Sequence, residues 1–110
     1  MIRRAEVLLH GIPVGLLEES LDGFRFQYSD THVAMGGRPI SASLPVRTPP
    51  YSEKQLFPFF EGLLAEGELR KIQCRLAHLS ENDGFGLLLA TCTEDTPGAV
   101  TVRLLEEPAS

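Results

Sequence analysis

The stretch LDGFRFQY, residues 21–28, carries the strongest local structural signal in this 110-residue chain. Its Asp22-Gly23 pair is a preferred turn of a two-stranded hairpin, because glycine adopts a positive φ at little steric cost. The residues after the turn alternate between aromatic and polar side chains: Phe24, Arg25, Phe26, Gln27 and Tyr28. Alternation with a period of two is typical of a strand that buries one face. The stretch therefore predicts a hairpin whose second strand adds aromatic side chains to the core.

Two short strands are expected upstream of this hairpin. Residues 2–9 mix apolar and polar side chains, and IPVGLLEES, residues 12–20, follows after His10-Gly11. Gly11 fits a tight turn between the two strands. Pro13 lies near the start of the second strand, where its missing N–H group is tolerated. The N-terminal part of the chain is therefore expected to be antiparallel β-structure.

Downstream of the hairpin, the pattern becomes less regular. The stretch AMGGRP, residues 34–39, is expected to be a loop. A short strand is expected next, because apolar and serine side chains alternate there: Ile40, Ser41, Ala42, Ser43 and Leu44. The stretch PVRTPPY, residues 45–51, is expected to be extended, since a residue before proline avoids the helical region.

Helices are expected in the second half of the chain. Ser52, with Gln55 three residues later, matches a capping box and predicts a helix from this point. Pro58 then either kinks that helix or lies in the first turn of a new one. Another helix, ending at about His78, is predicted by apolar residues at helical spacing: Leu69, Ile72 and Leu76.

The last part of the chain is expected to return to the sheet. The stretch SENDGFGLLLA, residues 80–90, predicts a loop that caps a short helix from Leu87 to Ala90. CTEDTPG, residues 92–98, is expected to be a turn, and AVTVRLL, residues 99–105, a strand. Three apolar residues of this strand are expected to face one way: Val100, Val102 and Leu104.

This order of elements predicts an α+β fold, with a small antiparallel β-sheet and two or three helices packed on one side. A single domain is expected over residues 1–105, because one core serves roughly 100 to 150 residues. Residues 106–110 are expected to form a frayed tail.

The segment LFPFFEGLLAEGELRK, residues 56–71, has a heavy apolar load. Four of its side chains are expected to pack against the sheet: Phe57, Phe60, Leu63 and Leu64. The direction of Phe59 is left open. The acidic residues that follow, Glu66 and Glu68, have no evident packing role.

Charge and composition exclude several classes of function. Hydrophobic residues make up 43% of the chain, which is enough for a core, and the formal net charge is −5. Direct nucleic-acid binding is not expected, because it requires clustered basic residues. The nearest group of basic residues is expected to be a solvated helix face: Arg70, Lys71 and Arg75.

Membrane insertion and secretion are not expected either. No apolar run approaches the roughly 18 residues of a membrane span. The start, MIRRAEVLLHG, reads as a strand because Glu6 interrupts its apolar run and no cleavage site follows. Cys74 and Cys92 form no CxxC pair, so reduced thiols in a cytoplasmic protein are expected.

Catalytic and metal-binding patterns are absent from the sequence. The histidines lack metal-site spacing: His10, His32 and His78. Ser41 and Ser43 lie outside any nucleophile-elbow motif. The stretch NDGFG lacks the other elements of a kinase site, and AMGGRP lacks the pattern of a phosphate-binding loop. We therefore expect a binding or interaction domain with no catalytic residue, no metal and no cofactor.

Six segments, taken in order, resemble the N-terminal subdomain of the HipA-type serine/threonine kinases, the toxins of bacterial toxin–antitoxin modules. The segments are VGLL, FRFQYSD, PISASLPVR, LFPFFEGLLAEGELRKI, NDGFGLLLA and DTPGAVTV, and the likeness runs from about Val7 to Val102. The chain departs from the family pattern at Ala65, where proline is common, and at Glu68, where a bulky residue is frequent. Each segment is weak alone, and their shared order makes the resemblance specific.

The resemblance implies a stand-alone version of this subdomain, similar to the HipS proteins of three-gene HipBST modules. Such a protein is expected to bind and neutralise a HipT-like kinase by docking beside its N-lobe and active-site cleft. A ternary complex with a HipB-like DNA-binding protein is also implied. The expected contact residues are Ala65, Glu66, Gly67, Glu68 and Leu69. The alternative is a structural subunit that completes a split kinase without inhibiting it.

Overall fold

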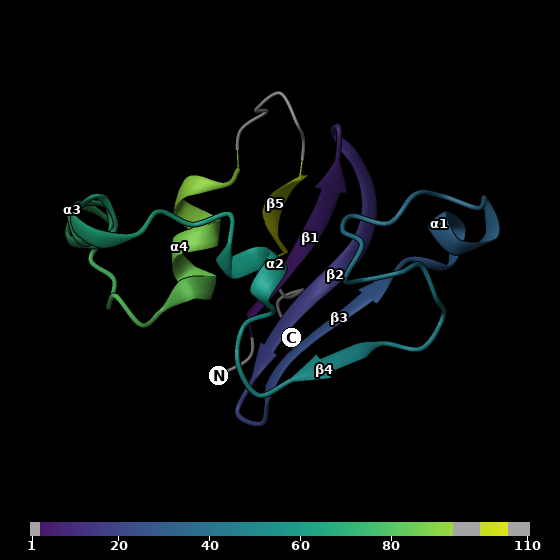
Figure 1. Cartoon of the computed structure of the whole chain (residues 1–110), viewed down its shortest axis with the longest axis horizontal. Helices are drawn as coiled ribbons and strands as arrows, with labels where there is room; N and C mark the ends of the chain where they lie inside the picture. Colours follow the sequence, from purple (N-terminus) through teal and green to yellow (C-terminus); the bar gives the residue numbers. More distant parts are fainter. Residues whose placement is uncertain (1–2, 94–99, 106–110) are drawn as a thin grey trace.

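The computed structural model describes residues 3–93 and 100–105 and has an α+β fold. Five antiparallel strands form one sheet with the order β4-β3-β2-β1-β5 (Figure 1). The strands are β1 (Arg3–Leu9), β2 (Ile12–Ser20), β3 (Gly23–Tyr28), β4 (Tyr51–Glu53) and β5 (Val100–Leu105). Four helices occur within the described residues: α1 (Asp30–Ala34), α2 (Pro58–Glu61), α3 (Gly67–Ala77) and α4 (Gly84–Thr91). The predicted fold class is confirmed.

The first three strands form the predicted antiparallel arrangement. His10 and Gly11 have φ values of 52° and 80° and make the tight turn between β1 and β2. The next hairpin is also confirmed, although its turn residues are Leu21 and Asp22, and Gly23 already pairs with Ser20. Gly23 has a φ of 132°, and a Cβ atom there would lie 2.3 Å from the carbonyl oxygen of Glu53. This glycine therefore permits both the turn and the close approach of β4.

Pro13 is accommodated by an irregularity in the pairing of β1 with β2. Val7 pairs with Gly15, whereas Leu8 pairs with Pro13, so one extra residue of β2 lies between the two pairs. A bulge of this kind interrupts the ladder, which allows a residue without an N–H group inside the sheet.

The core lies between the sheet and the helices. Phe26 of β3 and Phe60 of α2 are fully buried, and their ring centroids are 5.8 Å apart. The predicted burial of Phe57, Phe60 and Leu64 is confirmed. Leu63 is 37% exposed, contrary to prediction, because α2 ends at Glu61 and its helical spacing does not continue. Phe59, whose direction was left open, is partly buried and packs edge-on against Phe60.

The strand predicted at residues 40–44 is wrong, because this segment forms a turn. The N–H group of Ser43 donates to Oγ of Ser41 at 3.2 Å, and that of Leu44 donates to the Ser41 carbonyl at 3.0 Å. The buried hydroxyl of Tyr28 accepts from the N–H group of Ile40 at 3.0 Å and donates to the carbonyl of Leu44. Side-chain hydrogen bonds therefore take the place of a strand ladder.

The helix predicted to begin at Ser52 is also wrong. Residues 51–53 form β4, which pairs with the free edge of β3. The helix begins instead with Pro58 in its first turn, which was one of the two alternatives for that residue. The short helix α1, for which the sequence predicted no element, is capped by Oγ of Ser29, which accepts from the N–H group of His32.

Two predicted helices and the final strand are confirmed. Helix α3 ends with His78 in the left-handed conformation, and α4 begins earlier than expected, at Gly84. In β5, Val102 is buried, whereas Leu104 is 51% exposed at the end of the sheet. Most of the predicted turn at residues 92–98 and the predicted tail at residues 106–110 lie outside the described residues.

Candidate partner-binding surface

The five predicted contact residues lie together where the chain enters α3. Ala65 is half-buried, and the other four residues are exposed. Glu66 has an extended backbone and precedes the helix, and Gly67 begins it with a φ of 61°. No atom lies within 4 Å of the position that a Cβ atom of Gly67 would occupy, so glycine is favoured here by its φ value alone. The segment Ala65–Leu69 is therefore a single surface at one end of α3, at the edge of the molecule (Figure 1).

Helix α3 exposes its apolar side. Leu69, Ile72 and Leu76, named here the outer stripe, are 56%, 47% and 77% exposed. Cys74 is the buried residue of this helix and lies on the opposite side from the stripe, because successive helical residues are about 100° apart. A surface helix normally turns its apolar side towards the core. The outer stripe therefore extends the predicted contact segment along the helix.

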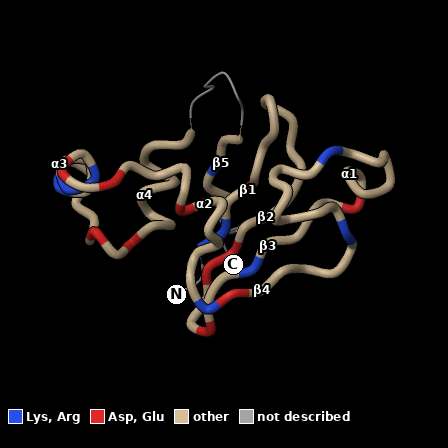
Figure 2. The backbone as a smooth tube through the Cα atoms, in the orientation of Figure 1, with Lys and Arg blue, Asp and Glu red and all other residues tan. Residues whose placement is uncertain are grey.

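Helix α3 also carries both acidic and basic residues, which are coloured by sign in Figure 2. Glu68 forms an ion pair with Lys71 at 3.5 Å, and the Glu68 side chain is 84% exposed. Such an exposed pair contributes little stability. The carboxylates of Glu66 and Glu68 lie at the start of α3, where the helix dipole favours negative charge. Their charges remain available to a partner.

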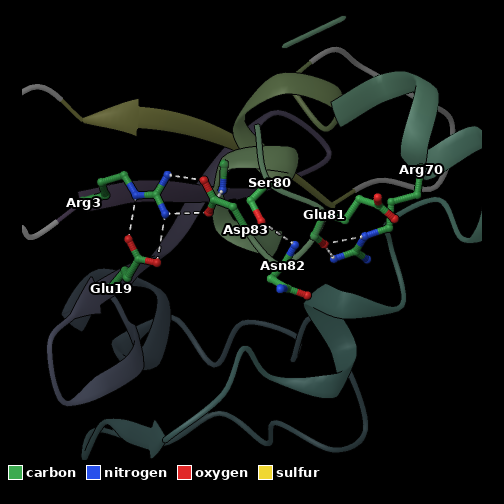
Figure 3. Close-up of polar contacts among 8 residues, drawn as sticks. Arg3, Glu19, Arg70, Ser80, Glu81, Asn82 and Asp83 are labelled. Atoms are coloured by element: carbon green, nitrogen blue, oxygen red, sulfur yellow. Dashed lines mark hydrogen bonds and ion pairs between the residues drawn. The ribbon is translucent and has the colours of Figure 1, made fainter. Parts of the chain in front are cut away.

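Arg70 holds the start of α3 in place, and sequence reasoning missed this role. Its Nη1 donates to Oε1 of Glu61 at 2.7 Å. Its Nε and Nη2 donate to the carbonyl of Glu81 at 3.1 and 2.8 Å (Figure 3). The Arg70 side chain is only 16% exposed, so its predicted place on a solvated helix face is wrong. Lys71 and Arg75 are exposed as expected. The contacts of Arg70 join α2, α3 and the loop before α4.

A second cluster fixes α4 to the sheet. The guanidinium of Arg3 donates to both carboxylate oxygens of Glu19, at 2.6 and 2.9 Å, and to both of Asp83, at 3.1 and 2.6 Å (Figure 3). It also lies 5.1 Å from the ring centroid of Phe85. Asp83 accepts from the N–H group of Gly86 at 3.0 Å and so caps α4. The hydrogen bonds from Arg3 hold the pKa of Asp83 below its usual range.

This cluster was not predicted from the sequence. The sequence predicts a loop at Asp83, although its position three residues before Gly86 matches an N-cap. Its pairing with Arg3 joins residues 80 positions apart, which no local pattern reveals. The cluster fixes the position of α4, and α3 packs on α4. It therefore also helps to position the candidate contact residues at the start of α3.

The histidines lie in separate environments. His10 is in the first turn, His32 stacks on the ring of Tyr28, and His78 ends α3. Among residues 3–93 and 100–105, no three His, Cys, Asp or Glu side chains are grouped so that they could hold a metal ion. Both cysteines are free thiols. No helix in the described part of the chain has the length and apolarity to cross a membrane.

Sequence comparison identifies the family of this domain. The HipA N-terminal domain family matches residues 5–103, which is nearly the whole of the described structure. The chain belongs to this family. The solved N-terminal domain of HipA toxin superposes on this HipA N-terminal domain with a TM-score of 0.75 and 32% sequence identity, covering 98% of the chain and 97% of that structure. The predicted family resemblance is confirmed, and it supports a HipA-related toxin–antitoxin context.

Relatives of this HipA N-terminal domain differ greatly in length. An uncharacterized protein of Haemophilus influenzae is 34% identical over 103 residues, which cover 94% of this chain and 93% of that protein. The putative kinase Y4dM of Sinorhizobium fredii is 36% identical over 108 residues, covering 89% of this chain but 26% of the kinase. The putative kinase Y4mE of the same organism is 42% identical over 50 residues, which are 46% of this chain and 12% of that protein. The chain thus matches nearly the whole of one relative of similar length and about a quarter of the much longer putative kinase Y4dM.

Proposed function

We propose that this HipA N-terminal domain is an antitoxin-type protein that binds a HipT-like serine/threonine kinase and neutralises it. The observation that carries the proposal is the size difference between its relatives. The domain makes up 93% of the Haemophilus protein but about a quarter of the putative kinase Y4dM. Where this domain is part of a longer kinase, it would pack beside the kinase core. The same domain as a separate protein would keep the surface that fits such a core. Docking beside the N-lobe would obstruct the active-site cleft.

The proposed contact is the segment Ala65–Leu69. Arg70, the next residue along the chain, ties the start of α3 to Glu61 and to the carbonyl of Glu81. The segment therefore leads into a fixed helix, so binding requires little ordering and loses less conformational entropy. Leu69 offers an exposed apolar anchor, while Glu66 and Glu68 offer negative charge. Such charges mainly steer association towards a basic surface of the partner, and a few buried anchors supply most of the affinity.

Co-expression with a HipT-like kinase tests the proposal. Cells that produce the kinase alone are expected to stop growing, and production of this chain should restore growth. The two proteins should also co-purify. Persistent growth arrest together with failure to co-purify would refute both the binding and the neutralisation.

Reversing the acidic charges tests the contact segment. We expect Glu66→Lys with Glu68→Lys to weaken neutralisation while the domain remains folded, as checked by circular dichroism. The variant Glu66→Gln with Glu68→Gln removes the same charges without reversing them and should have a smaller effect.

A matched control separates local contact from net charge. Asp22→Lys with Glu53→Lys changes the net charge equally, but at the β2–β3 turn and in β4. We expect this control to neutralise the kinase as well as the unmodified chain does. If the control and the Glu66→Lys, Glu68→Lys variant restore growth equally well, the segment is not part of the kinase interface.

The second candidate is a structural subunit that completes a split kinase. Its support is the presence of the same domain within the much longer putative kinase Y4dM. Phosphorylation assays with and without this chain distinguish the two functions by sign: an antitoxin lowers kinase activity, whereas a completing subunit raises it. In either case we propose a cytoplasmic location, no direct nucleic-acid contact and a ternary complex with a HipB-like DNA-binding protein.

A further inference from the structure

The outer stripe groups three exposed apolar side chains on one helix of the described structure. Leu69, Ile72 and Leu76 lie on consecutive turns of one helix and are all about half or more exposed. Single exposed apolar residues are common on protein surfaces, whereas interaction sites are found at contiguous exposed apolar patches. The row faces away from α4, because Cys74 on the opposite side of α3 is buried. Its partner must therefore come from outside the described domain.

The charges beside the stripe indicate what that partner is. Glu68 and Arg75 are two helical turns apart and lie on the same flank of the stripe. Leu69 and Leu76 are also two turns apart, and both pairs are centred close to Ile72. A two-fold axis that is perpendicular to α3 and passes between the two helices at the level of Ile72 would therefore place Leu69 beside Leu76 of a second copy. The same axis would place Glu68 beside Arg75 of that copy, and the reverse pair would form by symmetry.

We propose that α3 pairs antiparallel with α3 of a second copy of this chain. The apolar contact covers the outer stripe, and two Glu68–Arg75 ion pairs fix the antiparallel direction, as charged flanks do in coiled coils. The helix has only 11 residues, and its stripe has three side chains, well below the contact of about 800 Å² per partner in a typical stable complex. The dimer is therefore weak and forms only at high protein concentration.

This self-association goes beyond the proposed kinase binding and competes with it. Leu69 and Glu68 belong to both contacts, so the chain that binds a kinase is the monomer. The two proposals fail independently, because self-association is measured with the purified chain alone and neutralisation requires a kinase.

Sedimentation equilibrium over about a hundredfold range of concentration measures the association by mass action. We expect the average mass to rise from the 12.1 kDa monomer towards twice that value. Ile72→Asp should keep the chain monomeric throughout. Leu21→Asp, which changes an apolar residue that is 92% exposed in the β2–β3 turn, is the matched control and should dimerise normally. Circular dichroism confirms that each variant is folded.

Charge reversal tests the antiparallel arrangement. Glu68→Arg alone and Arg75→Glu alone each create two repulsive pairs and should weaken the dimer roughly tenfold. The double variant restores both attractive pairs and should recover the original dissociation constant. Failure of the double variant to recover would overturn the antiparallel arrangement.

Two other results would overturn the proposal as a whole. One is a chain that stays monomeric at the highest concentration. The other is a dimer that Ile72→Asp leaves intact, which would place the self-contact elsewhere. If the chain is monomeric and Ile72→Asp abolishes co-purification with the kinase, the outer stripe belongs to the kinase interface.

Discussion

Replacing Phe60 with alanine is expected to lower the free energy of unfolding by about 3 to 5 kcal/mol, as measured by urea denaturation. The side chain is fully buried, and it joins α2 to the sheet. Its ring centroid lies 5.2 Å from that of Phe59, 5.8 Å from that of Phe26 and 6.3 Å from that of Phe57. Truncation leaves a cavity among these rings, and the antiparallel sheet cannot collapse to fill it without losing its pairing.

Leu63→Ala is the matched control for this prediction. Leu63 is three residues away in the same segment, but it is 37% exposed. Its truncation should cost less than about 1 kcal/mol. A loss below about 1 kcal/mol for Phe60→Ala would contradict the assignment of Phe60 to the core.

Replacing Asp83 with alanine has the second largest expected effect, a loss of about 2 to 3 kcal/mol at neutral pH. The change removes the cap of α4 and half of the hydrogen bonds that Arg3 makes in this cluster. Because the Asp83 side chain is only 24% exposed, water compensates incompletely. Asp83→Asn retains a capping side chain but loses the charge, so it should be less destabilising than alanine.

The same cluster predicts how stability depends on pH. The hydrogen bonds from Arg3 hold the pKa of Asp83 below its ordinary value of 3.8. The unfolded chain therefore binds the proton more readily than the folded chain, so this contribution to stability is present above about pH 4. It is lost as the pH falls through the lower pKa of the folded state. Urea denaturation at a series of acidic pH values measures this loss.

The two Asp83 variants provide the comparison. Neither alanine nor asparagine has a proton to bind at this position, so both should show a shallower fall of stability with decreasing pH. An unchanged slope in Asp83→Asn would contradict the role of this carboxylate in acid stability.

Several features of the fold could be predicted because they depend on neighbouring residues. The alternation in Phe24–Tyr28 identifies a strand with a buried face, and Asp22-Gly23 identifies its hairpin. Helical spacing identifies α3, and its expected end at about His78 agrees with the observed end at Ala77, where His78 is the C-cap. The order of these elements was enough for the fold class, and six short segments in sequence were enough for the family.

The errors arose where distant residues decide the local structure. At residues 40–44 the alternating pattern resembles a strand, but the hydroxyl of Tyr28 takes hydrogen bonds that a ladder would need. At Ser52 the capping pattern is overruled by the free edge of β3, which offers backbone hydrogen bonds to β4. Local propensity is weak compared with such tertiary contacts.

The sequence by itself determined the fold class, the family and the existence of α3 with its apolar row. Only the tertiary structure decided that the row of Leu69, Ile72 and Leu76 faces outward, that Arg70 is an anchor and that Asp83 binds Arg3. The physical reason is that helical spacing determines which side chains lie on the same side of a helix. What covers that side depends on which elements pack together, and in this domain α4 covers the side of α3 that carries Cys74.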